Sequence, residues 1–199
     1  VRGSILASTG ETLAYTQVNG DGSETRIYPY ENMFAHIVGY DANGKNGLES
    51  LANFQLMTSH DGYFNQVKNE MKEEKNLGDS VVTTLDVSLQ KRAYEALGQN
   101  RGAVVALNPK TGAVLAMVSK PDFNPNTVAQ DWEYLTGDAS NSSLLNRATQ
   151  GAYPPGSVFK IVTALSYLRS EGTLDGFSYE CQGGITVDDH TITCYGGEV

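Results

Sequence analysis

The sequence has little cysteine, histidine or positive charge. It contains 2 cysteines and 3 histidines among 199 residues, which excludes a disulfide-rich scaffold and any zinc site built from cysteines alone. Only 14 residues are lysine or arginine, against 23 aspartates and glutamates, so the formal net charge is −9. Because an acidic chain without a basic stripe repels phosphate backbones, we expect no nucleic acid partner.

Long hydrophobic runs are also missing. No stretch approaches the roughly 18 consecutive apolar residues of a membrane-spanning helix, and the first residues lack the charged-then-apolar layout of a secretion signal. We expect these residues to be water-soluble as they stand, with any anchor outside them. The composition, 40% hydrophobic and 19% charged, is that of a globular protein of one to two domains.

The chain changes character near residue 77. The segment before it is rich in Gly, Asn, Tyr and Ser with short apolar runs, which predicts an irregular, β-rich module. A charge run over 68–75 then leads into a Leu-Gly-Asp-Ser turn. We place a domain boundary there, giving domains 1–77 and 78–199; the alternative is a solvated loop.

Regular patterns follow this boundary. A strand-like run over 81–85 leads into Asp86, a good N-cap for a predicted helix over 87–97. Apolar runs over 102–107 and 113–118 flank a five-residue turn and predict a β-hairpin. Because these strands are apolar on both faces, we expect them to lie centrally in a sheet that is covered on both sides.

The segment 153–160 reads Tyr-Pro-Pro-Gly-Ser-Val-Phe-Lys and continues as a predicted helix from Ser157 to Ser170. The apolar stripe of this helix consists of Val158, Ile161, Val162, Leu165 and Leu168. We expect a helix with so little polar surface to be buried. Burial makes Lys160, in the first turn, costly unless it has a partner or a chemical task.

Ser157 and Lys160 stand three residues apart, nearly one helical turn, so hydroxyl and amine can meet on one face. A serine hydroxyl becomes a strong nucleophile beside a base, and lysine serves as that base where burial or positive neighbours lower its pKa. The backbone N–H of Ser157 can donate to a developing oxyanion. The pair predicts serine acyl transfer without histidine, metal or cofactor.

Other polar residues receive simpler interpretations. Ser88 and Lys91 repeat the Ser-x-x-Lys spacing, but they lie among charged residues of an amphipathic helix and predict a solvated face. The histidines, His36, His60 and His190, are far apart and show no serine triad order, so we expect surface or hairpin roles.

Cys181 and Cys194 flank a run over 182–193 that alternates β-formers around a polar centre and predicts a hairpin. A hairpin brings its two ends together, so we expect that these cysteines can form a disulfide in an oxidising compartment. The alternative is a zinc site with His190 as a third ligand, which lacks a fourth.

Taken together, several motifs resemble one known family. Residues 153–160, with Leu-Asn-Arg-Ala at 145–148 and the stretch 101–119, resemble the class B penicillin-binding proteins, the peptidoglycan D,D-transpeptidases. Arg-Gly-Ser-Ile at 2–5 and Gly-Leu-Glu at 47–49 are similar to the non-catalytic module of that family. The resemblance runs in order over nearly the whole chain.

The resemblance implies an α+β fold. Residues 1–77 would form the irregular β-rich pedestal or dimerisation module. Residues 78–199 would form part of a penicillin-binding or serine β-lactamase-like transpeptidase domain, an antiparallel sheet with helices on both faces. It also implies a position on the extracytoplasmic face of the bacterial cell membrane, anchored by an N-terminal segment absent from this chain, with other cell-wall synthesis proteins as partners.

The resemblance further implies a reaction. Ser157 would attack the penultimate D-Ala carbonyl of a peptidoglycan stem peptide and release the terminal D-Ala, while Lys160 takes the serine proton. An amine of a neighbouring stem peptide would then resolve the acyl-enzyme into a crosslink. β-Lactams would act as covalent inhibitors by acylating the same serine.

Two further motifs of the family, Ser-x-Asn and a Lys-Thr-Gly strand after the nucleophile, do not occur in the sequence. Residues 110–112 spell Lys-Thr-Gly, but they precede the nucleophile in the predicted hairpin turn and have a structural role. We therefore expect these 199 residues alone to be inactive. Two alternatives stay open: a serine β-lactamase or β-lactam sensor domain, and a non-catalytic scaffold module of wall synthesis.

Overall fold

The computed structural model describes residues 1–60, 75–137, 140 and 142–194. Contacts along the chain form two compact units, Val1–Ala152 and Tyr153–Val199, and each is described by itself below. Most of the charge run predicted over 68–75 lies outside the described residues. Within the described ranges, every helix is too short or too polar to cross a membrane.

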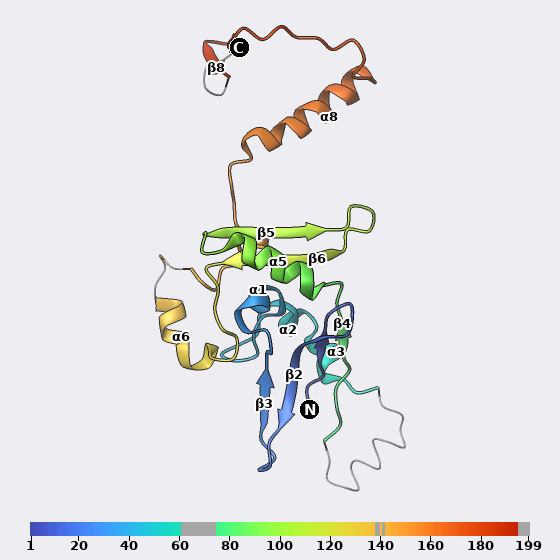
Figure 1. Ribbon diagram of the computed structural model, residues 1–199, viewed down its shortest axis with the longest axis vertical. Coiled ribbons are helices and arrows are strands. Elements are labelled where there is room, and N and C mark those ends of the chain that lie inside the picture. Colours follow the sequence, from blue (N-terminus) through green and yellow to red (C-terminus); the bar gives the residue numbers. More distant parts are fainter. Residues whose placement is uncertain (61–74, 138–139, 141, 195–199) are drawn as a thin grey trace. The chain divides into compact units, whose positions relative to one another are not determined.

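The first unit contains a four-stranded sheet, of which β2, β3 and β4 are labelled in Figure 1. Its strands are, in spatial order, β3 (Glu24–Ile27), β2 (Thr12–Val18), β1 (Ile5–Leu6) and β4 (Val81–Val82). β1 runs antiparallel to β2 and parallel to β4, with Ile5 opposite Val81. Residues on both sides of the boundary predicted after residue 77 thus share one sheet, and that boundary stays a prediction.

The strand expected over 81–85 is shorter than predicted. Thr83 still donates its backbone N–H to the Leu6 carbonyl, at 2.9 Å. Beyond it, the backbone N–H of Asp86 donates to the Leu115 carbonyl, at 2.9 Å, and Asp86 caps the next helix. The segment after β4 therefore leaves β1 between Thr83 and Asp86, because the backbone N–H of Asp86 donates to Leu115 instead.

Short helices pack beside the sheet. They are η1 (Glu31–Phe34), α1 (Ala35–Val38), α2 (Gly47–Leu51) and α3 (Asn53–Met57). Together with β1 and β2 they bury an apolar core that includes Ile5, Leu13, Phe34, Leu56 and Leu85. Burial of these side chains holds the β-rich module together, because removing apolar surface from water is the main favourable contribution to folding.

A charged cluster lies inside this module. The Glu49 carboxylate is fully buried and accepts from the Nε of Arg2 at 2.6 Å and from the Nε of Arg26 at 2.8 Å. Arg2 also donates to the side chain of Asn53 and to the Glu49 carbonyl. Each oxygen of the buried carboxylate thus has a guanidinium partner, which offsets the cost of removing its charge from water.

The predicted helix and hairpin are confirmed. α5 spans Val87–Leu97, and the Asp86 side chain accepts from the backbone N–H of Leu89. β5 (Gly102–Leu107) pairs antiparallel with β6 (Val114–Lys120). α5 lies against this hairpin (Figure 1).

The central position expected for the hairpin is wrong. Among the described residues β5 and β6 pair with each other only. Ala116 and Val118 are buried with Ala93 of α5, but Val105 and Leu107 are exposed. α5 covers one face of the hairpin and the other face is only partly covered, so apolar strands alone do not guarantee a central place.

The described residues of the first unit also form α6 (Val128–Gly137) and α7 (Arg147–Gln150). The second core consists of Ala35, Tyr40, Phe123, Val128 and Leu135. Asn126 links this part to the sheet module, because its side chain accepts from the Tyr28 backbone N–H at 2.9 Å and donates to the Tyr28 carbonyl at 3.0 Å.

The second unit contains a helical segment and a hairpin. Its elements are η2 (Gly156–Phe159), α8 (Lys160–Glu171), β7 (Gly184–Val187) and β8 (His190–Thr193). Gly172 ends α8 in the left-handed conformation, with φ of 77°, which glycine adopts without steric cost. The helix end and the cysteine-flanked hairpin agree with the sequence prediction.

Candidate functional site

Ser157 and Lys160 come together at the start of the second unit. The predicted helix from Ser157 to Ser170 is corrected in its first turn: residues 156–159 form the 3-10 helix η2, and α8 begins at Lys160. Pro155 precedes the turn, and Gly156 has a positive φ of 52°, so the chain enters through a bend. In a 3-10 turn, residues three apart lie directly above each other, which keeps the serine and the lysine on one side.

The two side chains line the same cavity. Its volume is about 420 Å³, and its other walls come from Tyr179, the cysteines, and the hairpin residues Gly184, Ile185, Ile192 and Thr193. A nucleophile and a base that share a cavity can act on one bound substrate. The structure therefore brings together the two residues that the sequence selected.

The second unit by itself does not bury α8, and the burial predicted for this helix stays a prediction. Val158, Ile161, Val162 and Leu165 are each more than half exposed, and Lys160 is exposed as well. Within its own unit the helix has one aromatic contact, between Tyr167 and Phe177, with ring centres 5.1 Å apart. The 42 described residues of this unit, 153–194, supply too little apolar surface to cover the stripe.

The cysteines lie at the ends of the hairpin that walls the cavity. The Sγ atoms of Cys181 and Cys194 are 3.2 Å apart, and both thiols are free. Their hydrogen bond lowers the pKa of the Cys181 thiol and raises that of Cys194. The predicted disulfide stays a prediction, with the two sulfur atoms already adjacent.

The zinc alternative finds no cluster in the described part of the chain. No three His, Cys, Asp or Glu side chains gather there in a way that could hold a metal ion. His190 instead uses Nδ1 in a 2.9 Å hydrogen bond to the Asp188 carbonyl.

Sequence reasoning missed the remaining walls of the cavity. Tyr179 precedes Cys181 by two residues, and Ile185 lies opposite Ile192 in the hairpin. Side chains two apart in extended chain point to the same side, so this spacing was a usable signal.

The repeated motifs have the structural roles that the sequence predicts. Ser88 donates to Asp86 at 2.6 Å, and Lys91 lies 3.9 Å from Glu95 on the exposed face of α5. Residues 110–112 form the turn between β5 and β6, where the Asn108 side chain accepts from the Lys110 backbone N–H at 2.9 Å. Neither segment lines the cavity of Ser157.

The surface role predicted for His36 is wrong. Its ring is buried, its Nε2 lies 3.1 Å from the Pro121 carbonyl, and it packs edge-on against Phe123. Burial lowers the pKa of His36 below its ordinary 6.5. His60 is exposed and pairs with Asp79, and His190 lies in the hairpin, as predicted.

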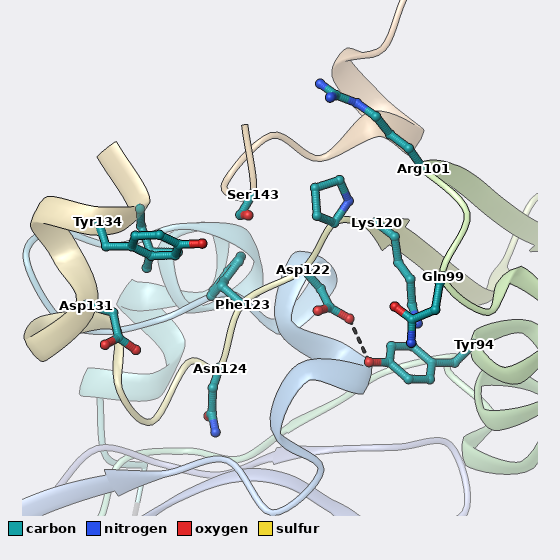
Figure 2. A pocket seen from close by; sticks show the side chains of 12 residues that line it. Tyr94, Gln99, Arg101, Lys120, Asp122, Phe123, Asn124, Asp131, Tyr134 and Ser143 are labelled. Atoms are coloured by element: carbon teal, nitrogen blue, oxygen red, sulfur yellow. Dashed lines mark hydrogen bonds between the residues drawn. The ribbon is translucent and has the colours of Figure 1, made fainter. Parts of the chain in front are cut away.

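A second cavity, about 610 Å³, lies in the first unit between α5, α6 and the segment after β6 (Figure 2). The Tyr94 hydroxyl donates to Asp122 at 2.7 Å, and Asn32 donates to the other oxygen of that carboxylate at 3.0 Å. The Lys120 ammonium donates to the Gly98 carbonyl at 2.6 Å and lies 3.7 Å from the centre of the Tyr94 ring. These groups bind one another and fix the end of α5 to the segment after β6.

Comparison with known proteins places both parts of the chain. Residues 2–81 match the model of the penicillin binding protein A dimerisation domain, and residues 102–198 match that of the penicillin binding protein transpeptidase domain. The peptidoglycan D,D-transpeptidase PbpA of Mycolicibacterium smegmatis is 36% identical over 187 residues, which are 85% of this chain and 38% of that protein. MrdA of Acinetobacter baumannii, also a peptidoglycan D,D-transpeptidase, is 32% identical over 73% of this chain and 26% of its own length.

Solved structures agree. Penicillin-binding protein A from M. tuberculosis, as a penicillin G acyl-enzyme complex, has a TM-score of 0.86 at 31% identity, over 98% of this chain and 49% of that one. The D,D-transpeptidase domain from Eggerthella lenta has a TM-score of 0.84 at 30% identity, over 99% of this chain and 44% of that one. The chain thus spans less than half the length of each of these relatives. The two penicillin-binding protein domain models together match most of the chain. It belongs to the penicillin-binding protein family.

Proposed function

We propose that the protein carrying this chain is a serine-type peptidoglycan D,D-transpeptidase. The observation that carries the proposal is the cavity shared by Ser157 and Lys160, inside the segment that matches the transpeptidase domain. Relatives named as peptidoglycan D,D-transpeptidases support the reaction class. That class of reaction implies peptidoglycan stem peptides as the substrate. It also implies an extracytoplasmic location, because peptidoglycan is crosslinked outside the cell membrane.

In this proposal, Lys160 accepts the hydroxyl proton while the Ser157 oxygen forms a bond to the penultimate D-Ala carbonyl carbon. The backbone N–H of Ser157 donates to the oxyanion. Collapse of the tetrahedral intermediate breaks the peptide bond, and the terminal D-Ala leaves with a proton returned to its amine. An amine from a second stem peptide then attacks the ester, forms the crosslink and restores the serine.

β-Lactams would acylate Ser157 in the same way, but the acyl group would not be transferred to an amine. A strained amide presented to Ser157 yields an ester whose slow hydrolysis traps the enzyme. Relatives solved as acyl-enzyme complexes with penicillin G and imipenem support this expectation.

We infer that the 199 residues by themselves do not acylate. A base must be held unprotonated beside its nucleophile, and burial or polar partners normally achieve this. Lys160 is exposed, and the sequence contains neither Ser-x-Asn nor a Lys-Thr-Gly strand after Ser157. The second oxyanion donor and the partners of Lys160 would have to come from residues outside this chain.

Labelling with a fluorescent penicillin tests both statements. The longer protein that carries the chain should be labelled in a one-to-one ratio, and its Ser157→Ala variant should not. The 199 residues alone should stay unlabelled; stoichiometric labelling that is lost on Ser157→Ala would overturn the second inference. Rapid loss of the label from the longer protein would indicate a β-lactamase instead.

The dimerisation-domain match suggests a role for residues 2–81. We propose that this module is a pedestal that docks other wall-synthesis proteins or a second copy. Binding that survives Ser157→Ala and β-lactam treatment would support a scaffold role beside catalysis. Loss of binding on β-lactam treatment would place the docking surface at the catalytic cavity instead.

A further inference from the structure

Two thiols stand beside the proposed nucleophile and base. Cys181 and Cys194 line the same cavity of about 420 Å³ as Ser157 and Lys160. Their Sγ atoms are 3.2 Å apart, and the Cys194 backbone N–H donates to the Gly183 carbonyl at 2.9 Å. The backbone thus already holds the two flanks of the hairpin side by side, so a bond between the sulfur atoms requires little movement.

The hairpin between the cysteines has little else to hold it. Ile185, Val187 and Ile192 are 45–64% exposed, and β7 pairs with β8 only among the described residues. A two-stranded hairpin without a packed face is marginally stable in water. A covalent link across its base would therefore be the strongest restraint on this wall of the cavity.

The thiols are also placed to react. Cys181 is exposed, and its hydrogen bond with Cys194 lowers its pKa, which favours the thiolate that attacks disulfides. The positive charge of Lys160 partly offsets the rise that the Cys181 hydrogen bond and burial cause in the pKa of Cys194. The charge of Lys160 thus reaches Cys194 across the cavity.

We propose that Cys181 and Cys194 form a reversible disulfide that regulates the Ser157–Lys160 site, with the oxidised form acylating faster. The proposal rests on the proposed function, because the regulated step is acylation of Ser157. Oxidation fixes the hairpin wall and removes the negatively charged thiolate from the cavity that Ser157 and Lys160 line. Reduction releases the wall and restores that thiolate.

The oxidation is thiol–disulfide exchange with a small disulfide such as oxidised glutathione. The Cys181 thiolate attacks one sulfur of that disulfide, which forms a mixed disulfide and expels one glutathione thiolate. The Cys194 thiolate then displaces the second glutathione and forms the Cys181–Cys194 bond. The protein loses two protons and two electrons, and the glutathione disulfide gains both as two thiols.

The test compares both redox states of the longer protein that carries this chain. After EDTA treatment, one sample is reduced with dithiothreitol and one is oxidised with glutathione disulfide. Alkylation and peptide mass spectrometry identify the Cys181–Cys194 link by a mass lower by two hydrogen atoms. The rate of labelling by fluorescent penicillin should be roughly tenfold higher in the oxidised sample, a scale that small displacements near reacting atoms produce.

The matched control is the double variant Cys181→Ser, Cys194→Ser. It should be labelled at the same rate under both conditions, close to the rate of the reduced wild-type protein. Circular dichroism confirms that the variant is folded, and Ser157→Ala gives the background.

Each other result counts against a defined statement. If the cysteines stay free in glutathione disulfide, or if the linked and free forms are labelled at equal rates, the regulatory proposal is wrong. If neither form is labelled although the link has formed, the proposed function fails and the regulation with it. If the double variant keeps the redox dependence, other cysteines of the longer protein cause it and the proposal is overturned.

Discussion

The two compact units treat their polar groups in opposite ways. In the first unit, Arg2 and Glu49 are buried, the Arg26 side chain is 8% exposed, and both guanidinium groups donate to the Glu49 carboxylate. In the second unit, Ser157, Lys160 and Cys181 are exposed and line one cavity. Charged groups that bond to one another out of water stabilise the fold, whereas polar groups that stay exposed in a cavity remain accessible to a substrate.

Removing the base should have the largest effect. Lys160→Ala in the longer protein should lower the rate of penicillin labelling by about 10²- to 10⁴-fold, the usual contribution of a general base. Thermal unfolding should change little, because the side chain is exposed. The matched control is Lys91→Ala, in the other Ser-x-x-Lys segment, which should keep the full rate. Equal effects of the two substitutions would remove Lys160 from the mechanism.

Breaking the buried charge cluster should be the largest stability effect. Glu49→Ala removes the carboxylate that accepts from both Arg2 and Arg26, and leaves Arg2 with Asp41, at 3.6 Å, as an acidic partner. We expect the free energy of unfolding to fall by about 3–5 kcal/mol. Urea denaturation measures it. Glu95→Ala, which removes an exposed partner 3.9 Å from Lys91, should cost less than about 0.5 kcal/mol. A small loss for Glu49→Ala would mean that the cluster does not hold the first unit.

A close backbone approach gives a test of intermediate size. A Cβ added at Gly78 would lie 1.9 Å from the Leu56 carbonyl oxygen, so Gly78→Ala should lower the free energy of unfolding by about 1–3 kcal/mol. Gly20 has no atom within 4 Å of such a Cβ, and Gly20→Ala should leave stability unchanged or slightly raised. If both variants melt alike, the packing of residue 78 against α3 is looser than the structure shows.

The smallest effect should appear on acidification. Burial lowers the pKa of His36 below 6.5, so the unfolded chain binds a proton more readily than the folded one. The resulting stability is fully present above pH 6.5 and is lost as the pH falls from 6.5 toward the lower folded value. We expect His36→Gln to flatten the dependence of the melting temperature on pH in that window.

Local signals predicted much of the fold. The Asp86 cap and the spacing that follows it gave the helix 87–97, and the alternating runs around residues 108–112 and 188–189 gave both hairpins. These elements depend on residues within a few positions of one another, through caps, turns and periodicity. The Ser157–Lys160 pair was predictable for the same reason, since its spacing fits one turn of either helix type.

Long-range contacts escaped prediction. Glu49 lies 47 residues from Arg2 and 23 from Arg26, so no local pattern announces their cluster. His36 is buried by Pro121 and Phe123, 85 or more residues away. The apolar stripe of α8 suggested a buried helix, yet residues 153–194 do not cover it.

From the sequence alone come the candidate residues for chemistry, namely Ser157, Lys160 and the two cysteines, together with the helix and hairpins that carry them. The tertiary structure alone set which side chains are buried, and it placed Cys181 and Cys194 in the wall of the cavity that Ser157 lines. The physical reason is the range of the forces involved. Caps, turns and periodicity act over a few residues, whereas burial depends on which distant segments have enough apolar surface to cover one another.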